Sequence, residues 1–249
     1  FGFFDSRKLK HTTFTFSGGV GDFGSNDPPA AVVMGYVKRL GTDMIRLCKL
    51  CGNQGKGAAV RKGMLRMRGE YGLMADADAA TDITGFGRLF EELKGAQSGG
   101  FGVGIGSRSH LAGDSVVSRP LLRTITMWCF HLCVSVLCTR QIKDTQCGFK
   151  LFTRSSAALL FETLHLERWA FDVELIYLCD KLALPMVEVP VNWEEVPGSK
   201  LIQGKLDVIT ASISMLRDML CVRVCYLLGL WRVDEAQWAT REWSKVKRA

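Results

Sequence analysis

Two aspartates one residue apart, Asp76 and Asp78, are the pair in this sequence best suited to metal chemistry. They follow the apolar run Tyr71–Ala75, whose length and polar flanks predict a buried strand. Ligands of open α/β sheets bind at the carboxyl ends of strands. Side chains two residues apart on a straight strand are separated by about 6.5 Å, whereas Mg²⁺ binds its oxygen ligands at about 2.0–2.1 Å. Either the chain bends at Ala77, or Asp76 faces a nucleotide or a metal-bound water while Asp78 binds the metal.

A glycine-rich segment, Asn53–Gly57, precedes the predicted strand and opens a helix predicted over Ala58–Arg68. The backbone N–H groups at such a helix start suit a phosphate, and Lys56 and Arg61 add positive charge. The segment is not a Walker A loop, because two residues rather than four separate its outer glycine from the Gly-Lys pair, and no Ser or Thr follows. An ordinary glycine turn before a basic surface helix is the alternative. Without this neighbouring segment, the two aspartates would be typical of solvated loop acids.

A strand is predicted over Gly99–Gly106 (GGFGVGIG), where glycines alternate with apolar residues. The glycines leave one face of the strand bare, so another group can approach the backbone closely. The strand leads to Arg108, whose guanidinium could bind a phosphate through two hydrogen bonds. A lone arginine at a strand exit is also typical of an ordinary surface.

Composition indicates one globular α/β domain. The chain has 249 residues, 47% hydrophobic and 23% charged, which is enough to bury a full core. Its net charge of +7 favours polyanionic partners, namely nucleic acid, phosphorylated small molecules or an anionic membrane surface. It has no uninterrupted apolar run of about 20 residues and no signal-peptide layout at the start. The nine cysteines lie mostly in apolar, helix-like contexts and indicate a reducing compartment.

The remaining elements are predicted from hydrophobic periodicity and from proline and glycine boundaries. Strands are expected at Thr12–Phe16, Met44–Leu50 and Pro185–Val191. Helices are expected at Pro28–Gly41, Ile83–Leu93, Arg154–Leu164, Glu167–Leu175 and through the final third, and Leu121–Cys138 is expected to be a buried or interfacial helix.

Several segments in this order and spacing carry a resemblance to a known family. They are Gly55–Arg61, Met74–Asp78, Gly106–Arg108, Asp144–Phe152 (DTQCGFKLF), Glu167–Leu175 (ERWAFDVEL), Val191–Trp193 and Gly198–Leu201. Together they resemble the dolichyl-phosphate β-glucosyltransferases, which are inverting, nucleotide-sugar-dependent glycosyltransferases of the GT-A fold and are related to dolichyl-phosphate mannose synthase. The resemblance covers roughly residues 24–232.

The resemblance implies a GT-A, Rossmann-like α/β fold with a mixed, mainly parallel sheet flanked by helices. We expect a poorly matched segment at 1–23, the glycosyltransferase domain at 24–204, and C-terminal amphipathic, interfacial helices with a tail at 205–249. The family usually begins with a membrane-anchoring helix and a first strand ending in a Pro-x-Tyr-Asn-Glu-like loop, and neither is found before Gly24. The sheet is therefore expected to lack its first strand, for which a truncated sequence is the preferred explanation. Ala79 stands where the family usually has glycine.

The resemblance also implies transfer of glucose from UDP-glucose to dolichyl phosphate, with inversion, at the cytosolic face of the endoplasmic reticulum membrane. Mg²⁺ or Mn²⁺ is the implied cofactor, bound by Asp76 and Asp78. The implied donor-binding residues are Asp22, Gly24, Ser25, Lys56, Gly57, Arg61 and Asp76. Because the acceptor is already an anionic phosphate, its site should be organised by cations, for which the candidates are Arg108, Lys143, Lys150 and Lys200. Asp78 and Asp172 are the catalytic candidates, Asp172 either as a base or as a group that orients a cation.

Two other functions stay open. The chain could use GDP-mannose as a mannosyltransferase, or it could be a truncated, inactive homologue that binds a membrane through its basic helices. A nucleic-acid-binding function is disfavoured, because the basic residues are dispersed and lack the aromatic and basic signature of a known module. The sequence leaves the oligomeric state undetermined.

Overall fold

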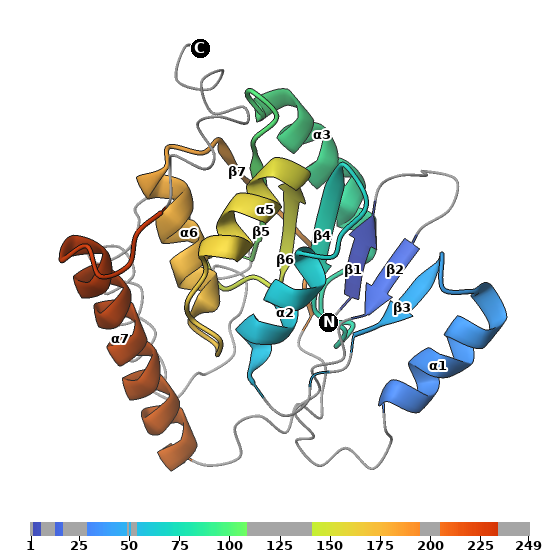
Figure 1. The fold of residues 1–249 in the computed structure, drawn as a ribbon, viewed down its shortest axis with the longest axis horizontal. Helices are drawn as coiled ribbons and strands as arrows, with labels where there is room; N and C mark the ends of the chain where they lie inside the picture. The colour runs from blue at the N-terminus through green and yellow to red at the C-terminus, as the bar shows by residue number, and fades with distance from the viewer. Residues whose placement is uncertain are drawn as a thin grey trace.

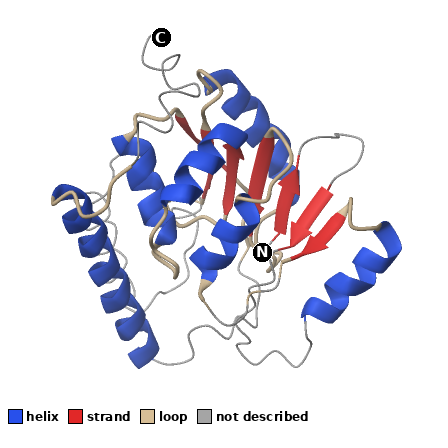
Figure 2. Cartoon of the chain, in the orientation of Figure 1, coloured by secondary structure: helices blue, strands red, loops and turns tan. Residues whose placement is uncertain are grey.

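The computed structural model describes residues 2–5, 13–16, 29–48, 50, 54–108, 141–194 and 205–233. The helix expected at Leu121–Cys138 lies outside these residues. Within them, seven strands form one sheet in the order β3-β2-β1-β4-β6-β5-β7, with helices against it (Figure 1, Figure 2). The strands are β1 (Gly2–Asp5), β2 (Thr13–Phe16), β3 (Ile45–Leu47), β4 (Tyr71–Ala75), β5 (Val103–Ser107), β6 (Phe149–Thr153) and β7 (Met186–Pro190). The helices are α1 (Pro29–Leu40), α2 (Lys56–Met64), the 3₁₀ turn η1 (Ile83–Gly85), α3 (Phe86–Ala96), α5 (Arg154–Thr163), α6 (Phe171–Lys181) and α7 (Lys205–Leu227).

The sheet is mixed, as the resemblance predicted. β2 pairs with β3 and β5 pairs with β7 in parallel, whereas β1 and β6 run antiparallel to both of their neighbours. All strands except these two therefore point the same way. A further strand lies in the sheet between β2 and β4. That strand is β1, which runs antiparallel. Its sequence, GFFD, does not alternate as that of β2 (TFTF) does, and no Pro-x-Tyr-Asn-Glu-like loop of the kind expected after the family's first strand follows it.

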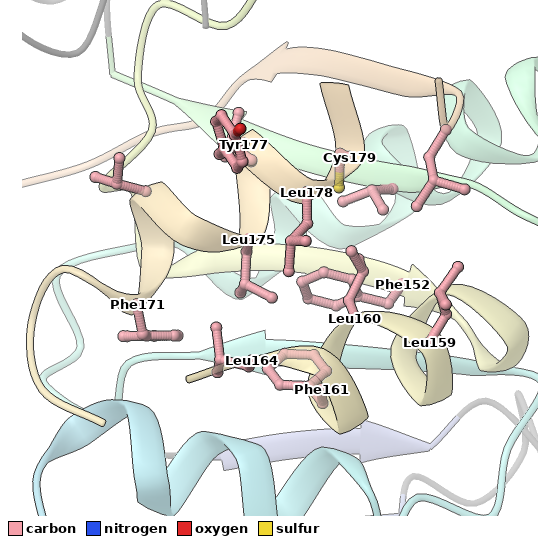
Figure 3. Packing of buried hydrophobic residues seen from close by; sticks show 14 of the residues in the cluster. Phe152, Leu159, Leu160, Phe161, Leu164, Phe171, Leu175, Tyr177, Leu178 and Cys179 are labelled. Carbon is pink, nitrogen blue, oxygen red and sulfur yellow. The ribbon is translucent and has the colours of Figure 1, made fainter. Parts of the chain in front are cut away.

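The larger hydrophobic cluster lies between the sheet and helices α2, α5 and α6. Figure 3 shows side chains of α5 and α6 directed toward Phe152 of β6. The ring of Phe152 meets that of Phe161 edge to face, with 5.2 Å between centroids. Side chains on a strand alternate between its faces, so Lys150 of β6 lies on the same face as Phe152. This places a lysine on the face that carries the larger cluster.

Helix α3 covers the opposite face, over the glycines of β5. A Cβ added at Gly102 would lie 2.8 Å from Leu93 Cδ1, and one at Gly104 would lie 2.9 Å from Leu89 Cδ1. The bare face predicted for this strand thus admits α3. The strand begins at Val103 rather than Gly99, because Ser98 and Phe101 bond to each other across a tight turn.

Helix α7 packs one of its faces against the domain. Met219, Val222 and Tyr226 are buried, whereas Ile213, Leu220 and Leu227 are exposed. The face of α7 that is turned away from the domain therefore carries apolar side chains as well. None of the helices in the described part of the chain combines the length and apolar character needed to cross a membrane.

Candidate active site

Asp76 follows β4 directly and occupies a partly buried position between two other segments. Its backbone N–H donates to the carbonyl of Gly148 at 3.1 Å. Its Oδ2 pairs with Lys56 Nζ at 2.9 Å, and the Lys56 side chain is only 8% exposed. Its Oδ1 is buried and has no hydrogen-bond partner among the described residues. A buried carboxylate oxygen without a partner is costly, so this atom is a candidate to accept a ligand.

The charge on Asp76 is opposed by its surroundings. Burial raises the pKa of this carboxyl above its usual value, and the charges of Asp172 and Asp78 act in the same direction. The charge and hydrogen bond of Lys56 act against the increase but do not cancel it. A bound cation would favour the ionised form for the same reason that Lys56 does.

Asp78 lies in the turn after the strand and is exposed. Its Oδ1 accepts a hydrogen bond from the N–H of Ala80 at 3.0 Å. Since β4 ends at Ala75 and the chain turns at Ala77, the straight-strand spacing does not apply to the two aspartates. Ala79 has a φ of +59°, in the left-handed region that favours glycine. The backbone thus explains why glycine suits this position.

Gly55 at the N-cap of α2 and Gly57 in its first turn permit close packing against the segment between α5 and α6. Gly55 has a φ of +95°, and a Cβ there would lie 2.5 Å from the carbonyl oxygen of Glu167. A Cβ at Gly57 would lie 2.7 Å from both the carbonyl oxygen of Leu166 and Phe171 Cβ. The N–H of Ala58 donates to the Glu167 carbonyl at 3.0 Å. The glycine pattern is therefore accounted for by contacts within the protein.

Arg61, predicted to bind the donor, is engaged at the C-terminal end of α5. Its Nε donates to the carbonyl of Phe161 at 2.8 Å, and its Nη2 donates to that of Glu162 at 3.1 Å. These carbonyls have no partner within their own helix, and a cation there also complements the helix dipole. The structure thus gives Arg61 a role in joining α2 to α5, and its role toward the donor stays a prediction.

Arg108 is held in one orientation beyond the end of β5. Its Nε and Nη2 donate to the two carboxylate oxygens of Asp144 at 2.7 and 2.9 Å. Its guanidinium carbon lies 5.5 Å from the centroid of the Trp193 ring. The hydrogen bonds with Asp144 raise the pKa of Arg108. Burial would raise the pKa of Asp144, but the hydrogen bonds and charge of Arg108 outweigh it and hold that pKa below its usual value. The Arg108 side chain is still 33% exposed.

Glu188 of β7 fixes the turn that carries Asp144. Its two carboxylate oxygens accept hydrogen bonds from the N–H groups of Lys143 and Asp144, each at 3.0 Å. Lys143 itself is exposed. Glu188 therefore anchors this turn to the sheet at Lys143, which is one of the predicted acceptor cations.

Lys150 and Asp172 form a buried ion pair. Lys150 Nζ donates to Asp172 Oδ1 at 2.6 Å and to the carbonyl of Cys147 at 2.7 Å. The Lys150 side chain is 0% exposed, and that of Asp172 is 5% exposed. Direct contact between Lys150 and a phosphate would require the ammonium to leave this pair. The geometry therefore supports an electrostatic effect of Lys150 on the site without direct contact with the phosphate.

The predicted residues therefore fall into four groups. Lys56, Asp76, Asp78, Arg108, Lys150 and Asp172 are charged neighbours, each of which interacts with at least one of the others. Gly57 and Arg61 have structural partners of their own. Lys143 is exposed. The remaining candidates, Asp22, Gly24, Ser25 and Lys200, lie outside the described residues.

Sequence reasoning missed the supporting roles of Asp144 and Gly148. A Cβ on Gly148 would lie 2.1 Å from Asp76 Oδ2, so only glycine fits beside that carboxylate. Both residues belong to the segment Asp144–Phe152 that carried the family resemblance, and this was the available signal. Spacing alone could not reveal them, because their partners lie 36 and 72 positions away along the chain.

The carboxylates present fit a divalent cation only in part. Asp76 Oδ1 has no partner in the segments that the structure describes, Asp78 is exposed nearby, and hard cations favour such oxygens. Among the described residues, no group of three His, Cys, Asp or Glu side chains could hold a metal ion. The remaining ligands would have to be water or substrate oxygens, which is the usual arrangement for Mg²⁺ at phosphates.

Comparison with known proteins places this geometry in a family. The profile of glycosyl transferase family 2 matches residues 20–157. The dolichyl-phosphate β-glucosyltransferase of Dictyostelium discoideum is 46% identical over 232 residues, which are 93% of this chain and 69% of that protein. The Drosophila melanogaster protein of the same name is 44% identical over 237 residues (94% and 71% of the two chains). The Homo sapiens protein is 40% identical over 237 residues (94% and 72%). The chain therefore belongs to glycosyl transferase family 2 and, within it, to the family of dolichyl-phosphate β-glucosyltransferases.

Proposed function

We propose that this protein transfers glucose from UDP-glucose to dolichyl phosphate with inversion at the anomeric carbon. The observation that carries the proposal is the partly buried Asp76, at the carboxyl end of a central strand. Lys56 binds one of its oxygens, and the other has no partner within the described part of the chain. The names of the relatives support the acceptor and the transferred sugar. The choice of UDP as the carrier rests on the resemblance.

The donor side of the site is suited to a leaving diphosphate. Asp76 and Asp78 would hold Mg²⁺ or Mn²⁺, which supplies Lewis-acid stabilisation of the charge on the diphosphate. Lys56 keeps the Asp76 carboxylate oriented through its salt bridge and adds a fixed positive charge. Such preoriented charges need no rearrangement when the sugar–phosphate bond breaks.

On the acceptor side, an oxygen of the dolichyl phosphate attacks the anomeric carbon as the bond to UDP breaks, and UDP leaves with the bonding electrons. The phosphate is already anionic, so no proton must be removed for it to attack. Arg108, which Asp144 and Trp193 hold in place, would orient this phosphate. Asp172 is buried and bonded to Lys150, and this supports the role of orienting a cation over that of a base.

We further propose that the reaction takes place at the cytosolic face of the endoplasmic reticulum membrane. Dolichyl phosphate is a lipid, so the site must meet its acceptor at a membrane surface. The exposed apolar side chains of α7, including Ile213, Leu220 and Leu227, support contact with such a surface.

Transfer of radiolabelled glucose to dolichyl phosphate, measured with the full chain in detergent, tests the proposal. We expect transfer from UDP-glucose that is lost on chelation of divalent cations and in Asp78→Ala. Asp43→Ala is the matched control, because the Asp43 side chain is 94% exposed and its ion pairs with Arg46 and Arg68 lie at the surface. Full activity of Asp78→Ala would remove the metal assignment.

Two further measurements separate the other functions. Preferential transfer from GDP-mannose in a competition assay would identify a mannosyltransferase instead. Calorimetry with UDP-glucose addresses the inactive homologue, which should bind vesicles of anionic lipid but neither bind UDP-glucose nor turn it over.

A further inference from the structure

Glu174, in the first turn of α6, is a buried carboxylate that takes no part in the chemistry proposed above. It is 0% exposed. Its oxygens accept hydrogen bonds from the N–H of His165 at 3.1 Å, the N–H of Leu166 at 2.7 Å and the hydroxyl of Tyr226 at 3.1 Å. An isolated buried carboxylate is strongly unfavourable, so Glu174 must keep its hydrogen-bond donors. Because two of these donors are the N–H groups of His165 and Leu166, Glu174 fixes the backbone at these residues.

The fixed backbone belongs to the segment 164–170 between α5 and α6, which we call the α5–α6 loop. This loop forms the surface against which the start of α2 packs. The Glu167 carbonyl accepts the N–H of Ala58, and a Cβ at Gly55 or Gly57 would collide with the loop. Any shift of the loop must therefore shift the first turn of α2.

The loop also bounds the side chain of Lys56. Lys56 Nζ lies 5.7 Å from the ring centroid of Trp169 and 6.0 Å from that of Phe171 at the start of α6. Attraction between the ammonium and these rings depends on the position of the rings. The same ammonium forms the salt bridge with Asp76.

We propose that Glu174 is a positioning residue for the donor site, acting through the α5–α6 loop on Lys56. Because Tyr226 of α7 donates to the same carboxylate, the docking of α7 supports that position from the other side. The effect of Glu174 on substrate rests on the proposed function, whereas its effect on the backbone of α2 does not.

Hydrogen exchange measured by mass spectrometry tests the structural half of this proposal. Glu174→Gln keeps the shape of the side chain, but its amide nitrogen cannot accept a backbone N–H. We expect exchange to increase about fivefold, the factor for one lost hydrogen bond, both in the α5–α6 loop and at residues 56–60. Glu91→Gln, at an exposed position on α3, is the matched control and should change neither segment. Faster exchange confined to the loop would overturn the proposal.

A double-mutant cycle tests the functional half, with UDP and Mg²⁺ as the probe in calorimetry. Glu174→Gln should weaken UDP binding about tenfold in the wild-type background, the factor for one charge-assisted contact, and should have no further effect in Lys56→Met. Equal weakening in both backgrounds would show that Glu174 does not act through Lys56 and would overturn the proposal.

Two further outcomes, absence of UDP binding and failure of Glu174→Gln to fold, also bear on the proposal. If the wild-type chain does not bind UDP, the proposed function fails, and the exchange measurement alone decides the role of Glu174. If Glu174→Gln does not fold, Tyr226→Phe removes one hydrogen bond from the same carboxylate and leaves both backbone donors in place. Because that hydroxyl links the Glu174 carboxylate to α7, its loss should weaken the support of the loop, so exchange at residues 56–60 should increase by less than in Glu174→Gln. No increase there would overturn the proposal.

Discussion

Replacing Gly148 by alanine should displace the Asp76 carboxylate and slow glucosyl transfer by about 100-fold. The new Cβ would lie 2.1 Å from Asp76 Oδ2 and 2.3 Å from its Cγ. Ordinary nonbonded contacts begin near 3.4 Å, so the two groups must separate by about 1 Å or more. Asp76 cannot avoid the contact by a small shift, because its own N–H is bonded to the Gly148 carbonyl. A displacement of about 1 Å in a catalytic site typically costs about two orders of magnitude in rate.

The assay is the initial rate of transfer from UDP-glucose at fixed dolichyl phosphate and saturating Mg²⁺, together with the thermal unfolding midpoint. Gly95→Ala is the matched control, because nothing lies within 4 Å of a Cβ at this position on α3. Alanine is favoured over glycine inside a helix by about 0.5–1 kcal/mol. The control should therefore keep its activity and unfold at an equal or higher temperature.

A Gly148→Ala variant that retains about half of the wild-type rate or more would refute this reasoning. It would show either that the carboxylate of Asp76 moves without consequence or that the backbone adapts at little cost. A variant that fails to fold would be recognised by its unfolding midpoint. In that case Asp76→Asn, which changes the charge without adding an atom, provides the test of the same carboxylate.

The remaining predictions concern charge and backbone conformation. Lys150→Met should lower the free energy of unfolding by about 3–5 kcal/mol in denaturant titrations, because it removes the ammonium that pairs with the buried Asp172. The double variant with Asp172→Leu should recover most of that loss. Additive losses in the double variant would contradict the ion-pair argument. Ala79→Gly relieves the positive φ, which is worth about 1–2 kcal/mol, and adds entropy to the unfolded chain, which costs about 0.4–1 kcal/mol. The variant should therefore keep full activity and have an equal or higher unfolding midpoint. Burial raises the pKa of Asp76, so kcat/KM should decline with falling pH at a higher pH than for an exposed aspartate, whose pKa is about 3.9. Lys56→Met should move that decline to still higher pH, since Lys56 opposes the increase, and a shift to lower pH would contradict the assignment.

Most elements of the fold were predictable because their signals are local. The strand at Tyr71–Ala75 and the helices at Pro29–Leu40 and Arg154–Thr163 agree with their predicted positions to within a residue or two at each end. β1 was not predicted, because its sequence GFFD does not alternate between polar and apolar residues, whereas that of the equally short β2, TFTF, does. The glycines of β5 were correctly interpreted as a bare face, but the sequence could not show that α3 covers it.

For the candidate site, residue type identified the charged groups and tertiary structure assigned their partners. Asp76, Lys56 and Arg108 were selected from the sequence, and the structure brings them near one another. Lys150 was grouped with the acceptor cations, although its ammonium is bonded to Asp172. Whether a lysine faces a phosphate or a buried carboxylate depends on which helix covers its strand, and that is not a local property.

The sequence alone determined the family, the order of the elements and the set of ionisable residues, because these depend on residue identity and spacing along the chain. Only the tertiary structure decided that Asp144 clamps Arg108, that Gly148 leaves room for Asp76, and that Glu174 anchors the loop beside Lys56. The physical reason is that the strength of a charge or hydrogen bond depends on burial and on distances of a few ångströms. Those quantities are fixed when distant segments pack together.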